Sequence, residues 1–450
     1  MNKPKSITKR LLHNSSWLLG GKTAASLFSA LQSVIVARML GVDDYGLLVL
    51  IIAFVDCLNQ FFDFRVWETA TKYIGTFWTS GDKERTRSMV KLSYIVDISS
   101  GILAFAIAVL TAKLASVHLI QSEEALYFIW IYAFSLLIDT ANSTSDAILR
   151  VFDRFKNIAF ISSSSSFIKF VLVSIVLYSG MGIKGVLISY IAVSFLGFGI
   201  RQWAVHRTLK EKGIERWWGS NLHLIRDQWR GIAWFLGNTS ITATLKMAND
   251  NFLGILVLGY FSGKEAAAYY KIAKSFVKVM TRIMDPLYEA IYPELVRVLN
   301  LNNLRDLKKI LKYSTKTLMK FTIPLGIAIL IFSEQIVRLV YGDEYIPASN
   351  ALRIVTVAVL ITQLTFWINP ALLAFDKPGL RTVQGIISTT LYVVLLFILV
   401  PKFSYIGAAF AFLAYATVNA LISIINLRNS INEKEKLLEI NASPSANREV

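Results

Sequence analysis

Cysteine, histidine and charge are all scarce in this chain of 450 residues. Cys57 is the one cysteine, so it can form no intramolecular disulfide, and we expect it to be a packing residue. The histidines lie at scattered positions without the spacing of metal ligands, which predicts no metal site and no cofactor: His13, His118, His206 and His223. The G-x-x-x-x-G-K-[ST] phosphate loop of nucleotide hydrolases is also missing from the sequence.

Apolar residues dominate the composition instead. Hydrophobic residues make up 54% of the chain, charged residues only 17%, and the mean hydropathy is +0.52. A soluble chain of this length could not bury so much apolar surface, so the sequence predicts an all-α polytopic membrane protein. A helix needs about 20 apolar residues to cross the bilayer core. We expect about twelve transmembrane helices, at 15–38, 45–64, 92–111, 125–149, 157–178, 185–204, 231–257, 265–285, 317–333, 349–373, 381–400 and 405–427.

The distribution of lysine and arginine predicts the orientation of these helices. Alternate connections, beginning with 1–12 and ending with 428–450, hold 33 basic residues, whereas the connections between them hold 5. Positive residues stay on the cytoplasmic side, so we expect both termini to be cytoplasmic in a multi-pass protein of the cell (inner) membrane. The same bias explains the net charge of +17 without any nucleic acid, as a basic face toward anionic lipid headgroups.

A weak internal repeat divides the sequence into halves. Leu40-Gly41 recurs as Leu258-Gly259 and Phe152-Asp153 as Phe375-Asp376, with similar matches at Trp17/Trp234 and Gly185/Gly407. An even number of helices per half predicts two pseudo-symmetric six-helix lobes with a cavity between them. The expected divisions are an N-terminal lobe at 1–204, a cytoplasmic interfacial linker at 205–230, a C-terminal lobe at 231–427 and a polar cytoplasmic tail at 428–450.

Lysines inside the predicted spans suggest an anion-binding cavity. Lys271, Lys274 and Lys278 share one face of the eighth span, where like charges repel one another and packing alone does not explain them. The alternative is that their long stems reach toward a membrane surface, which suits Lys274 poorly because it lies near the middle of the span. Together with lysines on three other spans they form the predicted cationic set: Lys22, Lys169, Lys246, Lys271, Lys274 and Lys278.

Acidic residues also occur within the spans. Four of them are candidates for ion coupling or for pairing with the lysines: Asp56, Asp63, Asp139 and Asp250. In the fourth span, an i, i+4 pair between Asp146 and Arg150 is the plain structural interpretation.

Short motifs add a family resemblance. The segment Ala37-Arg38-Met39-Leu40-Gly41 leads to Asp44-Tyr45-Gly46 in the first half. The second half has Leu258-Gly259-Tyr260-Phe261-Ser262-Gly263, Leu339-Val340-Tyr341-Gly342 and Tyr405-Ile406-Gly407-Ala408-Ala409. With two six-helix lobes, this chain resembles the polysaccharide transporters of the multidrug, oligosaccharidyl-lipid and polysaccharide exporter superfamily, especially the O-antigen and exopolysaccharide flippases.

The resemblance implies a transporter rather than an enzyme. Its expected substrate is an undecaprenyl-pyrophosphate-linked oligosaccharide, flipped by alternating access through a cavity lined by spans 1, 2, 7 and 8. Partners would be this substrate, membrane lipids and, by extension, polysaccharide polymerase and chain-length machinery. Two alternatives stay open. One is a cation-coupled drug antiporter of the same superfamily, which the span 8 lysines disfavour. The other is a membrane-embedded polysaccharide polymerase or ligase, for which the longest outside connection (334–348) leaves little room.

Overall fold

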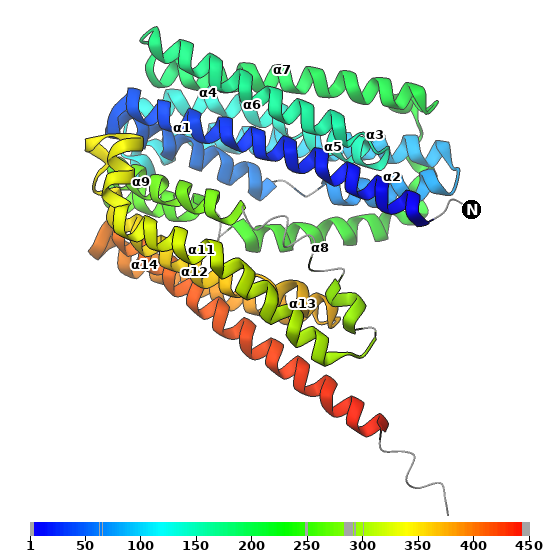
Figure 1. Cartoon of the computed structure of the whole chain (residues 1–450). Coiled ribbons are helices and arrows are strands. Elements are labelled where there is room, and N and C mark those ends of the chain that lie inside the picture. Colours follow the sequence, from blue (N-terminus) through cyan, green and yellow to red (C-terminus); the bar gives the residue numbers. More distant parts are fainter. Residues whose placement is uncertain are drawn as a thin grey trace, which may run out of the picture. The chain divides into compact units, whose positions relative to one another are not determined.

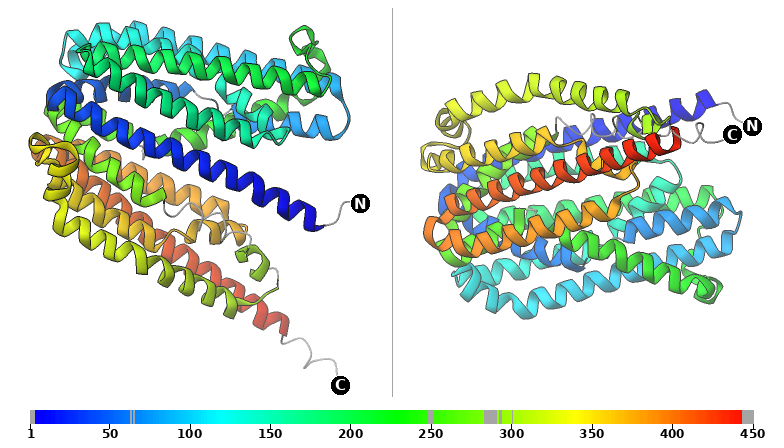
Figure 2. Two further views of the ribbon diagram at one scale, coloured as in Figure 1. Left: turned by 45° about the horizontal axis from the view of Figure 1, so that its top comes forward. Right: turned by 90° about the horizontal axis from the view of Figure 1, so that it is seen from below.

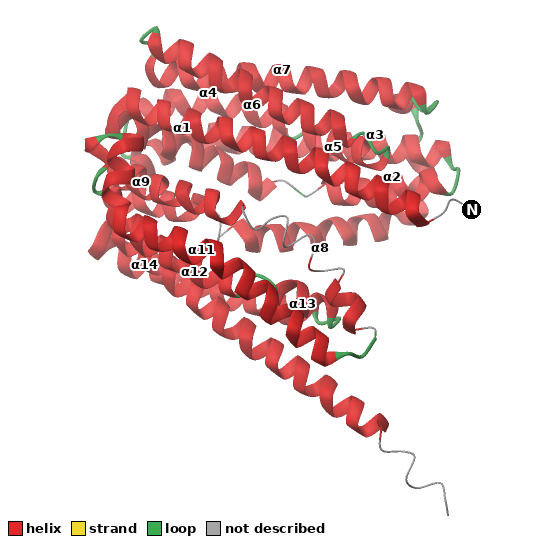
Figure 3. Cartoon of the chain, viewed as in Figure 1, coloured by secondary structure: helices red, strands yellow, loops and turns green. Residues whose placement is uncertain are grey.

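The computed structural model describes residues 4–62, 64, 66–247, 251–282, 291, 294–299 and 301–442. These residues form helices and short connections, with no strand among them (Figures 1 and 3). The longer elements are α1 (Pro4–Phe62), α3 (Lys83–Leu114), α4 (Glu124–Asp139), α6 (Phe155–Tyr178), α7 (Gly182–Glu211), α8 (Trp229–Met247), α9 (Asn251–Arg282), α11 (Leu304–Tyr341), α12 (Ala348–Leu364) and α14 (Pro378–Ala442). The shorter helices are α2 (Val66–Thr79), α5 (Asn142–Val151) and α13 (Ile368–Ala374). Short helical turns are η1 (Ala115–Ile120), η2 (Trp217–Gly219), η3 (Leu222–Gln228) and η4 (Asp343–Tyr345).

The chain divides into two compact units, Met1–Glu265 and Ala266–Val450. In the first unit α1 packs along α6, α6 along α7, and α3 along α4. In the second unit α12 packs against both α11 and α14. Within each unit the long helices run side by side (Figure 2). The division into six-helix lobes at 204 and 231 stays a prediction.

Among the described residues, eight helical segments are long and apolar enough to cross a membrane. Two of these segments, Gly20–Thr79 and Gly379–Leu438, each run for 60 residues, which is about three times the length of one crossing. A non-helical residue interrupts each of them, at Gly41 in α1 and at Ser404 in α14. The all-α polytopic class is therefore confirmed, whereas the number of twelve helices and the cytoplasmic termini stay predictions.

The sequence repeat has a counterpart in the backbone. Residues with positive φ recur in the same order and at a nearly constant separation along the chain. The pairs are Gly41 and Gly263, Gly81 and Asn302, Gln121 and Gly342, Asp153 and Asp376, and Gly182 and Ser404. Because a positive φ is rare outside glycine, five matches in register are strong evidence for an internal repeat. The match of Asp153 with Asp376 agrees with the register read from the sequence.

The structure corrects that register at one place. The sequence pairs Gly41 with Gly259, but Gly259 lies inside the helical first part of α9. The conformational partner is Gly263, with φ 83° and ψ −178°, against φ 76° and ψ 174° at Gly41. This region of backbone space is open essentially to glycine alone. Leu-Gly is a frequent dipeptide, and here the dipeptide recurs shortly before the turn that defines the repeat.

The motif around Asp44 has a structural explanation in the first unit. A Cβ added to Gly46 would lie 2.2 Å from the carbonyl oxygen of Lys264, so the two backbones meet where only glycine fits. The Lys264 ammonium lies 3.2 Å from the carboxylate of Asp43. The residues that follow the kink of α1 thus contact the residue that follows the kink of α9.

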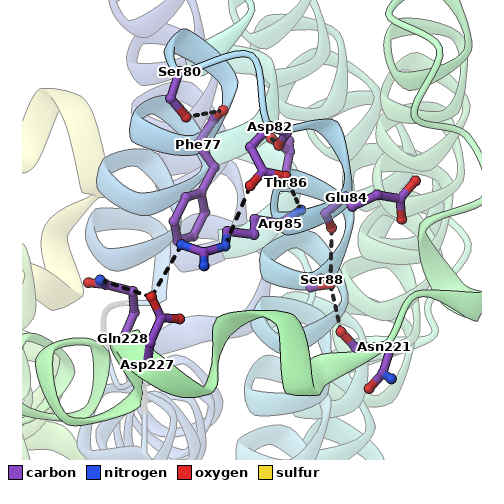
Figure 4. A network of polar contacts seen from close by, with 10 residues as sticks. All are labelled: Phe77, Ser80, Asp82, Glu84, Arg85, Thr86, Ser88, Asn221, Asp227 and Gln228. Atoms are coloured by element: carbon purple, nitrogen blue, oxygen red, sulfur yellow. Dashed lines mark hydrogen bonds and ion pairs between the residues drawn. The ribbon is translucent and has the colours of Figure 1, made fainter.

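The segment between α7 and α8 is fastened to the N-terminal end of α3 (Figure 4). The guanidinium of Arg85 lies 3.4 Å from Asp82 and 3.2 Å from Asp227. Ser88 donates its hydroxyl to the carbonyl of Asn221 at 2.9 Å. These contacts hold η3 along the first turns of α3.

Trp217 extends this attachment. Its ring stacks on Tyr94 of α3, with centroids 4.8 Å apart and planes at 22°, while Lys91 donates to the carbonyl of Ser220 at 2.9 Å. In this linker Trp217 therefore packs on protein, whereas Trp218 is 55% exposed.

Replacement of Gly263 by alanine tests the importance of the kink in α9. No atom lies within 4 Å of the added Cβ, so the cost would come only from the backbone, at about 1–3 kcal/mol. We expect a lower unfolding temperature in detergent. Gly199→Ala in α7, which also has open space but no positive φ, is the control and should be neutral or slightly stabilising. Equal stability of the two variants would refute the kink as a constraint.

Candidate functional site

A polar cluster occupies the interior of the first unit. It gathers side chains from four helices, α1, α4, α6 and α7. Gln32 of α1 donates to the hydroxyl of Tyr190 of α7 at 2.6 Å. Tyr132 of α4 donates to the Asp56 carboxylate at 3.3 Å, and the Lys169 ammonium of α6 lies 3.4 Å from the centroid of the Tyr190 ring. The structure thus brings together Asp56 and Lys169, two of the residues predicted from sequence.

Lys169 has two carboxylates in its electrostatic surroundings, those of Asp56 and Asp139. Asp139 itself accepts a hydrogen bond from the Asn142 amide at 3.4 Å. A charge inside an apolar helix bundle is costly unless opposite charge lies nearby, and these carboxylates supply it. The Arg201 guanidinium also lies in the electrostatic surroundings of Asp139, so both signs of charge meet in this cluster.

The second unit buries a lysine in aromatic surroundings. Lys274 of α9 is 6% exposed, and its ammonium lies 3.3 Å from the centroid of the Phe412 ring of α14. The Phe412 ring packs on Tyr392 and Tyr415, with centroid distances of 6.5 and 6.1 Å. The hydroxyl of Tyr392 lies 3.3 Å from that of Tyr270. A lysine that reached for a membrane surface would expose its ammonium, so the burial of Lys274 favours the interior position expected from the sequence.

The two lysine sites use the same position of the repeat. Tyr190 and Phe412 are as far apart in the sequence as the kinks at Gly41 and Gly263, and each of these rings carries an ammonium on its face. The ammonium comes from α6 in the first unit and from α9 in the second. In the register of the Asp153 and Asp376 match, Tyr392 stands at the position that corresponds to Lys169. The aromatic position is thus kept while the helix that provides the cation changes.

The remaining predicted residues are more dispersed. Lys271 is half-buried in the second unit, and Lys278 on the same helix is exposed. Lys22 is exposed on α1. Lys246 lies in α8, whose side-chain placement there is not described, and Asp63 and Asp250 lie outside the described residues. The structure therefore groups Lys169, Asp56 and Asp139 in one unit and places Lys274 within the aromatic group of the other.

One predicted pairing is wrong. Asp146 bonds at 2.8 Å to the Nε of Arg201 in α7 rather than to Arg150. The Arg150 guanidinium lies over the ring of Trp67, 5.2 Å from its centroid. The i, i+4 spacing allows a pair within one helix, but a neighbouring helix offers Asp146 a more rigid, partly buried partner.

Sequence reasoning missed the uncharged members of both clusters. They are polar or aromatic residues within predicted spans: Gln32, Tyr132, Tyr190, Tyr270, Tyr392 and Phe412. Their signal in the sequence is weak because tyrosine and phenylalanine are common in membrane helices for packing alone. Only the contact with a lysine or carboxylate distinguishes them.

Charge removal tests the cluster of the first unit. Lys169→Met would leave Asp56 and Asp139 without their shared cation, so we expect a fall in stability of about 1–3 kcal/mol. Adding Asp56→Asn should restore part of that loss, because one of the two carboxylates that lost the ammonium becomes neutral. Unfolding of the three variants in detergent measures the coupling. Strict additivity of the two substitutions would contradict the pairing.

Comparison with known sequences places these features in a family. The family model described as "Polysaccharide biosynthesis protein" matches residues 35–350. The inner membrane protein YghQ of Escherichia coli (strain K12) is 24% identical over 342 residues, which is 76% of this chain and 95% of that protein. The probable low-salt glycan biosynthesis flippase Agl15 of Haloferax volcanii is 24% identical over 190 residues, covering 42% of this chain and 40% of its own length.

Solved structures share the fold. An inward-facing multidrug resistance MATE family transporter of the MOP superfamily aligns with a TM-score of 0.75 at 15% identity, covering 92% of this chain and 96% of the other. The lipid II flippase MurJ, in an inward closed conformation, aligns with a TM-score of 0.71 at 14% identity, covering 92% and 88%. The resemblance expected from the motifs is confirmed: this multi-pass membrane protein has the MOP superfamily fold, and the chain belongs to the polysaccharide biosynthesis protein family.

Proposed function

We propose that this chain is a flippase that moves an undecaprenyl-pyrophosphate-linked oligosaccharide across the cell membrane by alternating access. Its family and the flippases among its relatives support transport of a lipid-linked glycan. The observation that carries the proposal is Lys274, a lysine buried in a helix bundle with its ammonium on the Phe412 ring.

The chemistry of this contact suits a pyrophosphate. A ring face attracts an ammonium through its quadrupole but carries no net charge, so the contact leaves the formal charge of the lysine intact. A pyrophosphate that approached it would gain a charge-assisted hydrogen bond, which is stronger than the ring contact. The proposed cationic set also includes Lys22, Lys246, Lys271 and Lys278. Lys169 would be a further substrate-binding lysine in the first unit.

The proposed topology has twelve crossings. The kink of α1 divides its long segment into two, as does that of α14, and the segment from α8 to the end of α9 is divided at Gly263. The three divided segments give two crossings each, and the other six candidate spans give one crossing each. The total is the twelve crossings expected from the sequence. Cytoplasmic termini and lobes at 1–204 and 231–427 complete this proposal.

A second candidate is a cation-coupled drug antiporter. The acidic side chains of Asp56 and Asp139 favour it, because a carboxylate could hold a proton, a sodium ion or an organic cation. In a flippase the same cluster would supply ion coupling. The identity of the transported substrate therefore distinguishes the two functions, whereas the identity of the coupling ion does not.

Transport of the lipid-linked glycan is the direct test. We expect the purified protein, reconstituted into liposomes, to move an undecaprenyl-pyrophosphate-linked oligosaccharide to the opposite leaflet. Lys274→Ala should lower the rate by at least about tenfold, since it removes a charge-assisted hydrogen bond to phosphate. Lys274→Glu should lower it further by repulsion, and Lys274→Arg should retain part of the activity.

Lys402→Ala is the matched control, because Lys402 lies on the same polypeptide unit with an exposed side chain. It should transport at the wild-type rate. Equal activity of wild type and Lys274→Glu would remove Lys274 from the site. Export of organic cations by wild type, without movement of the glycan lipid, would establish the antiporter instead.

A further inference from the structure

A pocket on the first unit shares no lining residue with either lysine site. It has a volume of about 310 Å³ and lies between the N-terminal part of α6 and the C-terminal part of α7. Two arginines, a glutamate and an asparagine line it together with exposed aromatic and aliphatic side chains: Arg154, Asn157, Phe160, Ile200, Trp203, Arg207 and Glu211. The proposed transport reaction uses none of them.

The pocket stands at the border between an apolar and a charged part of these helices. Large apolar side chains on α7 are exposed up to Ile200 and Trp203, and on α6 they are exposed from Phe160 onward. Beyond them come Arg207 and Glu211 on α7 and Arg154 before α6. In a multi-pass protein such an apolar surface faces acyl chains, so the charged end lies at the depth of the lipid headgroups. Tryptophan at this border is typical of the membrane interface.

Glu211 holds the two guanidinium groups in place without using all of their donors. Its carboxylate pairs with Arg154, and its other oxygen lies 3.2 Å from the Nε of Arg207. Two guanidinium groups carry about ten N–H donors, whereas one carboxylate accepts about four hydrogen bonds. The pocket keeps a net positive charge, with its arginines oriented before any ligand arrives. The Arg207 guanidinium also lies over the Trp203 ring, 5.8 Å from its centroid.

We infer that this pocket binds the headgroup of an anionic phospholipid. The phosphate would accept forked hydrogen bonds from Arg154 and Arg207, a geometry that arginine provides and lysine does not. The Asn157 amide would bond the glycerol or its ester oxygens, and the acyl chains would lie on Phe160, Ile200 and Trp203. The distribution of basic residues predicts that this end of α6 and α7 faces the cytoplasm, where the headgroups would be those of the inner leaflet.

The test titrates the full-length protein in neutral detergent with phosphatidylglycerol and, separately, with phosphatidylcholine, and counts bound lipid by native mass spectrometry. We expect saturable binding of phosphatidylglycerol in preference to phosphatidylcholine. Arg154→Gln/Arg207→Gln should weaken phosphatidylglycerol binding by at least about tenfold, because two charge-assisted hydrogen bonds are lost. Arg154→Lys/Arg207→Lys, which keeps the charge but not the fork, should weaken it less and guards against a folding defect.

Arg216→Gln/Arg226→Gln is the matched control. It removes the same charge from exposed arginines of the same unit that do not line the pocket, and it should bind phosphatidylglycerol as wild type does. Equal weakening by both double variants would overturn the inference in favour of general charge attraction. Three further results would overturn the inference. They are equal binding of the two phospholipids, binding of undecaprenyl phosphate but not of phosphatidylglycerol, and full displacement of bound phosphatidylglycerol by millimolar inorganic phosphate.

Discussion

The backbone hydrogen bond is the constraint on which this structure depends. In hydrocarbon no water replaces a lost N–H to carbonyl bond, so the chain stays helical wherever it can. The sharpest breaks inside α1 and α9 lie at Gly41 and Gly263, residues with unusual backbone freedom. The positions of these breaks, more than the side chains between them, mark the internal repeat. Long helices and a few sharp kinks are the consequence.

Charge is the second constraint, and each unit places a lysine ammonium on an aromatic ring. In the first unit the Lys169 ammonium lies on the Tyr190 ring, with the carboxylates of Asp56 and Asp139 in its electrostatic surroundings. The second unit places Lys274 on an aromatic ring. Two acidic side chains near the ammonium distinguish the first site, whereas two further aromatic side chains, Tyr392 and Tyr415, pack on the ring of the second.

Much of the fold could be predicted from the sequence, because a run of apolar residues has one stable form in a bilayer. The helical class, the family and the presence of a repeat all came from such runs and from short motifs. Lys274 could be singled out because a lysine at mid-span is rare. Tyr190 and Phe412 could not, since nothing in the sequence distinguishes a ring that holds an ammonium from one that packs. The Asp146 partner was missed because Arg201 lies on another helix, where sequence spacing carries no information.

The shared aromatic position also says something about how the halves have diverged. Five turns of the backbone recur, and so does the ring at Tyr190 and Phe412, yet the lysine on that ring has moved from one helix to another. The two halves share these backbone turns and the aromatic ring, but they differ in the helix that provides the lysine. A chain made of two copies of either half would keep the five shared turns and would repeat a single arrangement of lysine and ring. The asymmetry between the two lysine sites therefore resides in side chains, while these five turns are common to both halves.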